Sequence, residues 1–290
     1  MPPVSVIIPA YNRVAVIGAA IASVLDQSFT DFELIVVDDV STDGTVAAVE
    51  AIDDPRLRLV RRAANGGPGA ARNSGVAAAR GGIIAFLDSD DLWLPEKLTR
   101  QFAFMGERGV PVCCTGFELH RPGGGAPEIR LPDPPHLSGE DMIEKADITI
   151  GTTMAIERGF LDRVGPFDEN MRRLEDWDWQ LRLGRLGGLD FVPEALAIHH
   201  APDMRDIAEA TGIAARLIVA KHAAALAAVD IGLARRLRAM AARHQASANW
   251  MSGRYPAALG QALLSMSLQP GAALGFATRR LIPRLGDKDP

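Results

Sequence analysis

The stretch Ile83-Ile84-Ala85-Phe86-Leu87-Asp88-Ser89-Asp90-Asp91 indicates both the fold class and the place of a binding site. Its first five residues are an unbroken apolar run, which is typical of a strand buried on both faces. Three carboxylates follow, and burying an ionised carboxylate costs free energy unless a positive group pairs with it. A divalent cation, Mg²⁺ or Mn²⁺, is the simplest partner, especially where a diphosphate completes its oxygen ligands.

A helix cap is the alternative role for this acidic turn. Asp90 or Asp91 is placed to cap a helix that begins near residues 94–96. One carboxylate is enough for a cap, so the other two favour the cation.

Apolar runs alternate with segments of helical periodicity before this turn. Strands are predicted at 4–8, 33–37, 57–60 and 83–87, and helices at 14–25, 43–52 and 70–80, with Pro9 ending the first strand. This order predicts a parallel sheet with helices on both faces. Right-handed crossovers place the strand-to-helix loops at one edge of such a sheet, where ligands bind in open α/β folds.

Two of these loops carry candidate binding residues. Asp39 is suited to accept a hydrogen bond from a base or a ribose hydroxyl, and its alternative role is a helix cap, for which Asp43 is better placed. Tyr11 is suited to stack on a base, but taken alone it favours packing over the sheet edge.

The glycine-rich loop at Gly67-Pro68-Gly69 differs from a dinucleotide-binding fingerprint. Arg72 occupies the position of the third glycine, and Pro68 removes a backbone donor, which argues against a nicotinamide or flavin site. The planar fork of Arg72 suits a phosphate or a neighbouring aspartate, and both roles are compatible.

The second half of the chain holds another acidic group, Glu175-Asp176-Trp177-Asp178-Trp179. Carboxylates in a first helical turn favour the helix dipole, while one of them near a metal-bound diphosphate is suited to be a general base. His199 and His200 follow a short strand and offer a third metal ligand, although a histidine is more often structural. The expected elements are helices at 96–108, 158–164 and 174–186, strands at 111–117, 148–156, 191–192 and 195–199, a loop at 121–138, and helices from 204 punctuated by prolines at 256, 270 and 283.

Composition limits the remaining function classes. The chain has 290 residues and a net charge of −5, which gives no electrostatic case for nucleic acid. Cys113 and Cys114 are adjacent in one predicted strand and point to opposite faces, so we expect no disulfide and a reducing compartment. The first residues lack the features of a signal peptide, and no apolar run reaches the ~20 residues of a membrane span. We therefore expect a cytoplasmic protein that is not integral to a membrane.

Several motifs together resemble family 2 glycosyltransferases. The residues that carry the resemblance are Val4 to Asn12, Phe32 to Asp39 with Ser41-Thr42-Asp43-Gly44-Thr45, Gly69 to Asn73, Phe86 to Asp91, and Gly165-Pro166-Phe167-Asp168 with Glu175-Asp176-Trp177. The resemblance implies the GT-A fold: an α/β protein with a Rossmann-like nucleotide-binding half, a mostly parallel sheet and a C-terminal helical appendage. We expect a domain over 1–203, divided into a nucleotide half (1–92) and an acceptor half (93–203), and a helical region over 204–290.

The resemblance also implies residue roles. The residues expected to contact the nucleotide are Pro9, Tyr11, Asn12, Asp39, Arg72 and Ser89. The metal, Mn²⁺ or Mg²⁺, is expected to bind Asp90, with Asp88 and His200 as further ligands and His199 as the fallback for His200. Asp176 is expected to remove the proton from the acceptor. The implied reaction is a single inverting transfer from a UDP-, dTDP- or GDP-sugar to a glycan or lipid-linked acceptor, as in cell-surface polysaccharide synthesis. Asp91 is left with a capping or structural role.

Departures from the family pattern and rival functions complete the predictions. Val40 stands where a small residue is common, and the segment Gln180-Leu181-Arg182-Leu183 lacks the Gln-x-x-Arg-Trp motif of processive members. A sugar nucleotidyltransferase and an inactive nucleotide-sugar-binding scaffold are the alternatives. Arg279, Arg280 and Arg284 with nearby apolar residues suit peripheral contact with an anionic membrane, although a solvated helix packed on the domain is favoured.

Overall fold

The computed structural model describes residues 3–144, 148–201 and 204–270. The chain divides into two compact units, one of residues 1–139 with 146–202 and one of residues 140–145 with 203–290. A ten-stranded sheet with helices forms the first unit, and helices form the second.

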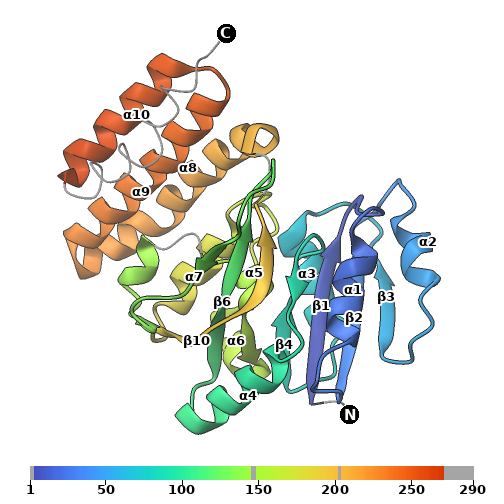
Figure 1. Cartoon of the computed structure of the whole chain (residues 1–290). Coiled ribbons are helices and arrows are strands. Elements are labelled where there is room, and N and C mark those ends of the chain that lie inside the picture. Colours follow the sequence, from blue (N-terminus) through green and yellow to red (C-terminus); the bar gives the residue numbers. More distant parts are fainter. Residues whose placement is uncertain (1–2, 145–147, 202–203, 271–290) are drawn as a thin grey trace. The chain divides into compact units, whose positions relative to one another are not determined.

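The first half of the sheet is parallel, in the order β3-β2-β1-β4. Its strands are β1 (Val4–Ala10), β2 (Phe32–Asp38), β3 (Leu57–Arg61) and β4 (Ile83–Phe86), and the helices between them are α1 (Ile17–Leu25), α2 (Thr45–Glu50) and α3 (Pro68–Ala78). Figure 1 shows β1, β2 and β4 side by side with α1 along them.

Helices cover both faces of this half, as predicted. Because side chains alternate along a strand, Val6 and Ile8 of β1 face the core that contains α1. Ile7 faces the other way, where a Cβ atom added to Gly75 of α3 would lie 2.4 Å from its Cγ2. Gly75 thus allows α3 to lie close to the sheet.

The prediction that Pro9 ends the first strand was wrong. β1 continues to Ala10, and Pro9 is in register with Val37 of β2. The pairing of β1 with β4 ends at Ile7, whose carbonyl accepts the N–H of Leu87 on that side at 3.1 Å. Pro9, two residues further, faces the same side beyond the paired segment, so its missing N–H removes no ladder bond.

The second half of the sheet mixes directions. β9 (Ala155–Glu157) lies antiparallel between β4 and β6 (Val112–His120), β6 is parallel to β10 (Leu189–His200), and β5 (Leu92–Trp93) pairs antiparallel with β10. The helices are α4 (Lys97–Arg108), α5 (Ile150–Thr153), α6 (Arg158–Val164) and α7 (Glu175–Leu183), of which α6 has the predicted bounds.

Three predictions in this half were wrong. Residues 148–156 are not one strand, because the short helix α5 precedes β9. The expected loop at 121–138 contains β7 (Glu128–Arg130) and β8 (His136–Leu137), which pair with β6 and β10. The two short strands at 191–199 are one strand, β10, with register shifts on either side of Ala195. Pro193 lies at the first shift, where a residue without an N–H is tolerated.

The second unit is helical, as predicted for the C-terminal appendage. It contains the 3-10 helix η1 (Asp141–Ile143), α8 (Met204–Val229), α9 (Ile231–Met251) and α10 (Tyr255–Leu268). α9 packs against both α8 and α10 (Figure 1). Asp230 caps α9, because its side chain accepts the N–H of Gly232 at 2.7 Å.

The expectation that no apolar run is long enough to span a membrane was wrong. Residues Ala208–Val229 of α8 are long and apolar enough to cross a membrane by length and composition alone. A helix in the core of a soluble protein passes the same test, so this finding does not assign a membrane span. The basic residues Arg279, Arg280 and Arg284 lie outside the described residues.

Candidate functional site

Strained backbone marks the loops around the predicted site. Among the described residues, the non-glycine residues with positive φ are Asn12 (53°), Val40 (67°), Thr149 (53°) and Leu174 (56°). Asn12 is a predicted site residue, Val40 follows Asp39, Leu174 precedes Glu175, and Thr149 is the N-cap of α5. The left-handed conformation costs an L-residue roughly 1–2 kcal/mol, so the surrounding contacts must hold it in place.

The loop after β1 is fastened to the loop after β2. The N–H groups of Asn12 and Arg13 donate to Ser41 Oγ at 3.0 Å and Thr45 Oγ1 at 2.7 Å. The amide oxygen of Asn12 accepts the N–H of Thr42 at 2.8 Å. Asn12 is therefore a structural link in this structure, while the ring of Tyr11 is 46% exposed and is free to meet a planar ligand.

Asp39 is buried and holds the glycine-rich loop. Its carboxylate accepts the N–H groups of Gly66 at 2.9 Å and Gly67 at 2.7 Å, and it pairs with Arg62 Nε at 2.8 Å. These bonds occupy both oxygens and fix the loop that begins α3. Asp43, not Asp39, bonds the first turn of α2, through the N–H of Thr45 at 2.9 Å. The contact of Asp39 with a base stays a prediction.

Arg72 joins the acidic turn to the second acidic group. Its Nη2 donates to Asp88 Oδ1 at 2.6 Å and its Nη1 to Glu175 Oε1 at 2.7 Å. Burial opposes the charge of Arg72, but the two carboxylates together raise its pKa above the usual range. The predicted pair with an aspartate is thus present, and Glu175 is a second partner that the sequence did not reveal.

Gly151 in α5 was also missed by sequence reasoning. A Cβ atom at this position would lie 2.6 Å from Asp88 Oδ2 and 2.6 Å from Arg72 Nη2. A larger residue at this position would therefore displace the side chains of this ion pair. No local pattern distinguishes Gly151 from other glycines of the chain, because the contact joins distant segments.

Asp91 has the structural role that was one of its two predicted alternatives. It is fully buried, and it accepts hydrogen bonds from His199 Nδ1 at 2.9 Å, from the N–H of His200 at 2.8 Å and from the hydroxyl of Thr152. It does not cap α4, whose N-cap residue is Glu96. Burial opposes protonation of His199, but Asp91 raises its pKa. His199 is thus committed to Asp91.

Asp90 and Asp88 form a carboxylate pair with residual negative charge. Burial, followed by the neighbouring charges of Asp88 and Asp91, raises the pKa of Asp90, and Arg13 at 3.6 Å from its Oδ2 counteracts this only in part. The buried side chain of Ser89 separates the two aspartates along the turn. His200 Nδ1 lies 2.6 Å from the carbonyl of Asp90, which leaves its Nε2 for a ligand.

These residues fit a magnesium- or manganese-type site that a substrate completes. Within residues 3–144, 148–201 and 204–270, no cluster of three or more His, Cys, Asp or Glu side chains is arranged to hold a metal unaided. Mg²⁺ is commonly bound through one or two carboxylates together with substrate phosphates, which is the donor set that Asp90 and Asp88 provide.

Asp176 lies in the first turn of α7, half-buried, and its Oδ1 accepts the N–H of Trp177 at 2.8 Å. Burial, followed by the charge of Glu175, raises the pKa of Asp176 to about 6, while Arg72 and Arg173 pull it down. A carboxylate with a pKa near neutrality is suited to accept a proton. The flanking tryptophans are structural: Trp179 donates to the carbonyl of Gly165 at 2.9 Å and stacks on Phe167.

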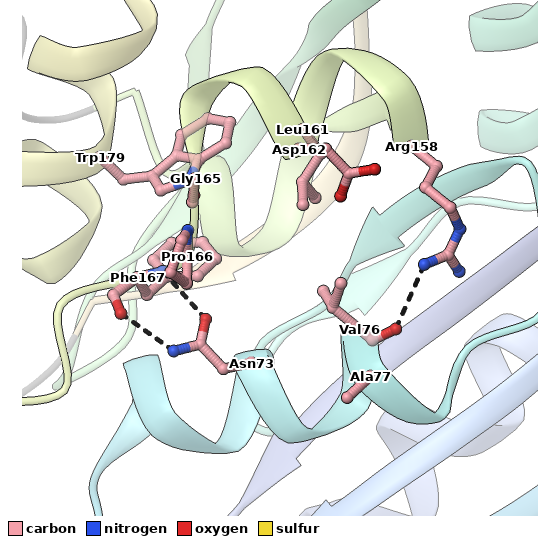
Figure 2. A pocket seen from close by; sticks show the side chains of 10 residues that line it. All are labelled: Asn73, Val76, Ala77, Arg158, Leu161, Asp162, Gly165, Pro166, Phe167 and Trp179. Carbon is pink, nitrogen blue, oxygen red and sulfur yellow. Dashed lines mark hydrogen bonds between the residues drawn. The ribbon is translucent and has the colours of Figure 1, made fainter.

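A cavity of about 340 Å³ lies between α3, α6 and the turn at 165–167 (Figure 2). None of the predicted site residues lines it. Asn73 holds one side, because its amide bonds both the N–H and the carbonyl of Phe167 at 2.9 Å. The cavity is therefore bordered by the turn at 165–167, which Trp179 of α7 contacts, and no residue of the acidic turn lines it.

Comparison with known proteins agrees with this geometry. The sequence model of Glycosyl transferase family 2 matches residues 5–165. The succinoglycan biosynthesis protein ExoO of Rhizobium meliloti is 34% identical over 248 residues, 81% of this chain and 69% of ExoO. The UDP-Glc:alpha-D-GlcNAc-diphosphoundecaprenol beta-1,3-glucosyltransferase WfgD of Escherichia coli is 39% identical over 116 residues, 40% of this chain and 46% of WfgD. The matched region is 62% of a third relative, TuaG of Bacillus subtilis.

Solved structures share the fold. Residues 1–349 of TarS from S. aureus, in complex with UDP, have a TM-score of 0.64 at 22% identity, over 94% of this chain and 82% of that chain. The mannosyltransferase PcManGT from Pyrobaculum calidifontis, in complex with GDP-Man and Mn²⁺, has a TM-score of 0.60 at 21% identity, over 99% and 88% of the two chains. The GT-A fold is thereby confirmed. With the family match over more than half of its length, this chain belongs to glycosyl transferase family 2.

Proposed function

We propose that this protein transfers one sugar from a nucleotide-diphosphate sugar to a hydroxyl group of an acceptor, with inversion at the anomeric carbon. The observation that carries the proposal is the pairing of Asp176 with the acidic turn. Asp176 has a pKa raised to about 6, and its neighbour Glu175 is bonded through Arg72 to Asp88. The element that carries the proposed proton acceptor and the turn that carries the proposed metal ligands are thus joined through one buried arginine.

The reaction needs one displacement. Asp176 takes the proton of the acceptor hydroxyl, the acceptor oxygen bonds to the anomeric carbon, and the bond from that carbon to the diphosphate breaks. Attack from the side opposite the leaving group inverts the carbon, and no covalent nucleophile is required. Asp90 and Asp88, with His200 Nε2 as a third ligand, would hold the Mn²⁺ or Mg²⁺ whose charge stabilises the leaving diphosphate.

The donor is assigned to the loops after β1 and β2. We assign base stacking to Tyr11, and further nucleotide contacts to Pro9, Asn12, Asp39, Arg72 and Ser89. Since Asp39 and Arg72 are already paired within the protein, they also shape the site by fixing the glycine-rich loop and the acidic turn. We propose a UDP-, dTDP- or GDP-sugar; the bound UDP of TarS, the GDP-Man of PcManGT and the UDP-Glc in the name of WfgD support the UDP- and GDP-sugars.

The acceptor is a glycan or lipid-linked intermediate of cell-surface polysaccharide synthesis. Support comes from ExoO, a succinoglycan biosynthesis protein, and from WfgD, whose name specifies a diphosphoundecaprenol-linked acceptor. We place the enzyme in the cytoplasm or peripherally on the inner face of the cell membrane, where such a donor and such an acceptor meet.

A thermal-shift screen of UDP-, dTDP- and GDP-sugars, each with and without Mn²⁺, tests the donor and the metal together, because a ligand of the folded state raises the melting temperature. Transfer is then measured with the donor that binds. Asp176→Asn should lower the rate by about 10²–10⁴-fold while donor binding is kept. Asp162→Asn, an exposed aspartate of α6, is the matched control. Donor binding without transfer to any acceptor would favour an inactive scaffold. Release of pyrophosphate from a nucleoside triphosphate supplied with a sugar 1-phosphate would favour a nucleotidyltransferase.

A further inference from the structure

Arg13 extends from the loop after β1 to the acidic turn. Its Nη2 lies 3.6 Å from Asp90 Oδ2, and both side chains are 42% exposed. Its Nη1 makes only long contacts, to the carbonyls of Tyr11 at 3.4 Å and Asn12 at 3.3 Å. Its Nε is buried and has no hydrogen-bond partner among the described residues. The guanidinium is thus close to its anion but incompletely bonded.

The backbone below this side chain is held firmly. The N–H of Arg13 donates to Thr45 Oγ1 at 2.7 Å, and the N–H of Val14 donates to Asp43 Oδ2 at 3.2 Å. Asn12 adopts a φ of 53° and is bonded to Ser41 and Thr42. A fixed backbone with a loosely bonded cationic side chain allows Arg13 to change partners at little cost.

The other two aspartates of the turn have closer partners. Asp88 has Arg72 at 2.6 Å, and Asp91 has His199 at 2.9 Å. Within the part of the chain that the structure describes, the ion-pair partner of Asp90 is the more distant and partly exposed Arg13. Arg13 therefore lies beside the carboxylate that is the predicted metal ligand, and its positive charge opposes the approach of a divalent cation.

We propose that Arg13 is a ligand of the donor diphosphate that rests on Asp90 when the donor is absent. This inference relies on the proposed function, since it presupposes a nucleotide-diphosphate donor at the acidic turn. Arg13 leaves Asp90 when the cation takes that carboxylate, and its planar fork, including the unpartnered Nε, bonds the oxygens of the diphosphate. Arg13 thus opposes metal binding in the free protein and supports donor binding in the complex.

The two effects have opposite signs, which makes them testable in one variant. Arg13→Ala should bind Mn²⁺ alone more tightly, on the order of fivefold at low salt, because a like charge is removed. The same variant should bind the nucleoside diphosphate in Mn²⁺ more weakly, by roughly 10- to 100-fold, because a charge-assisted hydrogen bond to phosphate is lost. The matching monophosphate should lose less, and Arg13→Lys should be intermediate.

Mn²⁺ binding is followed by the electron paramagnetic resonance of the free ion, and nucleotide binding by calorimetry with UDP, dTDP and GDP. Arg100→Ala is the matched control, because Arg100 pairs with Glu194 at the same 3.6 Å and is also exposed. Equal affinity of Arg13→Ala and the unchanged protein for the diphosphate would overturn the role of Arg13. Weaker binding of Mn²⁺ alone by Arg13→Ala would overturn the competition at Asp90. If the unchanged protein itself bound no nucleoside diphosphate, the proposed function would fail first.

Discussion

The guanidinium of Arg72 and the carboxylate of Glu175 form a buried ion pair, 2.7 Å from Nη1 to Oε1, that joins α3 to α7. The pair affects Asp176 in two ways. Glu175 raises the pKa of Asp176 through its negative charge, and Arg72 lowers it. Burial raises the pKa of Asp176 most, and the ion pair beside it adjusts this value.

Glu175→Gln separates these effects. The amide still accepts a hydrogen bond from Arg72, but the negative charge is gone, so the pKa of Asp176 should fall. We expect the acidic limb of the pH profile of kcat/KM to move down by about one pH unit. Glu107→Gln, an exposed glutamate of α4, should leave the limb in place. An unmoved limb in Glu175→Gln would show that Asp176 does not control it.

Asp176→Asn should stabilise the fold at pH 8 while it abolishes transfer. The pKa of Asp176 is raised to about 6 in the folded protein, so the ionised form is disfavoured there relative to the unfolded chain. This free-energy cost of ionising Asp176 in the folded protein is absent below pH 4 and grows between pH 4 and 6. At pH 8 it is complete and is on the order of 2 kcal/mol. Denaturant unfolding at pH 4 and pH 8 measures it.

Asp178→Asn is the contrasting variant for that experiment. Asp178 is buried and pairs with Arg182 at 3.1 Å, so its loss should destabilise the protein by about 1–3 kcal/mol. Destabilisation by Asp176→Asn at pH 8 would mean that Asp176 is structural and not held in a strained, functional state.

Local patterns predicted the first half of the fold well, because its strands are apolar runs and its helices have a periodic face. The second half depends on distant pairing. β9 lies between β4 and β6, and the short β5, β7 and β8 exist only through their partners. Residues 148–156 are rich in β-branched side chains, which favours a strand, yet the left-handed Thr149 begins a helical turn there.

The candidate site, like the fold, could be predicted only in part from local sequence. Clustered carboxylates are visible in sequence, because three aspartates after a buried strand violate the usual pattern of burial. Their partners are not visible: Arg72 and Glu175 are 103 residues apart, and Asp91 and His199 are 108 apart. The sequence therefore predicts the clustered carboxylates and a pair between Arg72 and an aspartate, but not the contacts that Arg72 and Asp91 make with Glu175 and His199.

Glu33→Gln should destabilise the protein in a pH-dependent way. Glu33 is buried in β2 and bonds Ser5, Arg58 and Arg80 at 2.6–3.0 Å. Burial raises its pKa, but these bonds outweigh burial and lower the pKa to about 2. The stabilisation is complete above the ordinary value of 4.5 and is lost as the pH falls through 2, so the variant should lose about 3 kcal/mol at pH 7.

Urea unfolding at pH 7 and pH 3 tests this expectation. The difference between Glu33→Gln and the unchanged protein should shrink at pH 3, since part of the native advantage is gone. Glu50→Gln, an exposed residue of α2, serves as the control. An equal loss at both pH values would assign the effect to packing instead of charge.

Lys97→Met should also change stability in a pH-dependent way, but over a more alkaline range. Lys97 is fully buried, its Nζ donates to Gln101 Oε1 at 2.6 Å, and the same Nζ lies 4.0 Å from the centre of the Trp93 ring. Burial lowers its pKa from 10.5 to about 7. Between these values the unfolded chain holds a proton that the folded protein has released, so stability rises with pH over this range. Below pH 7 the folded protein must carry a buried cation.

Methionine fills the same space without this charge, so the stability of Lys97→Met relative to the unchanged protein should be greatest at pH 6 and fall steadily towards pH 10. Unfolding in urea at pH 6, 8 and 10 measures the difference. Exposed Lys221→Met should show none of this slope. If this difference in unfolding free energy were the same at all three pH values, the ring of Trp93 and the amide of Gln101 would keep Lys97 protonated across the range. The loss of the Gln101 hydrogen bond would then be the sole effect of the substitution.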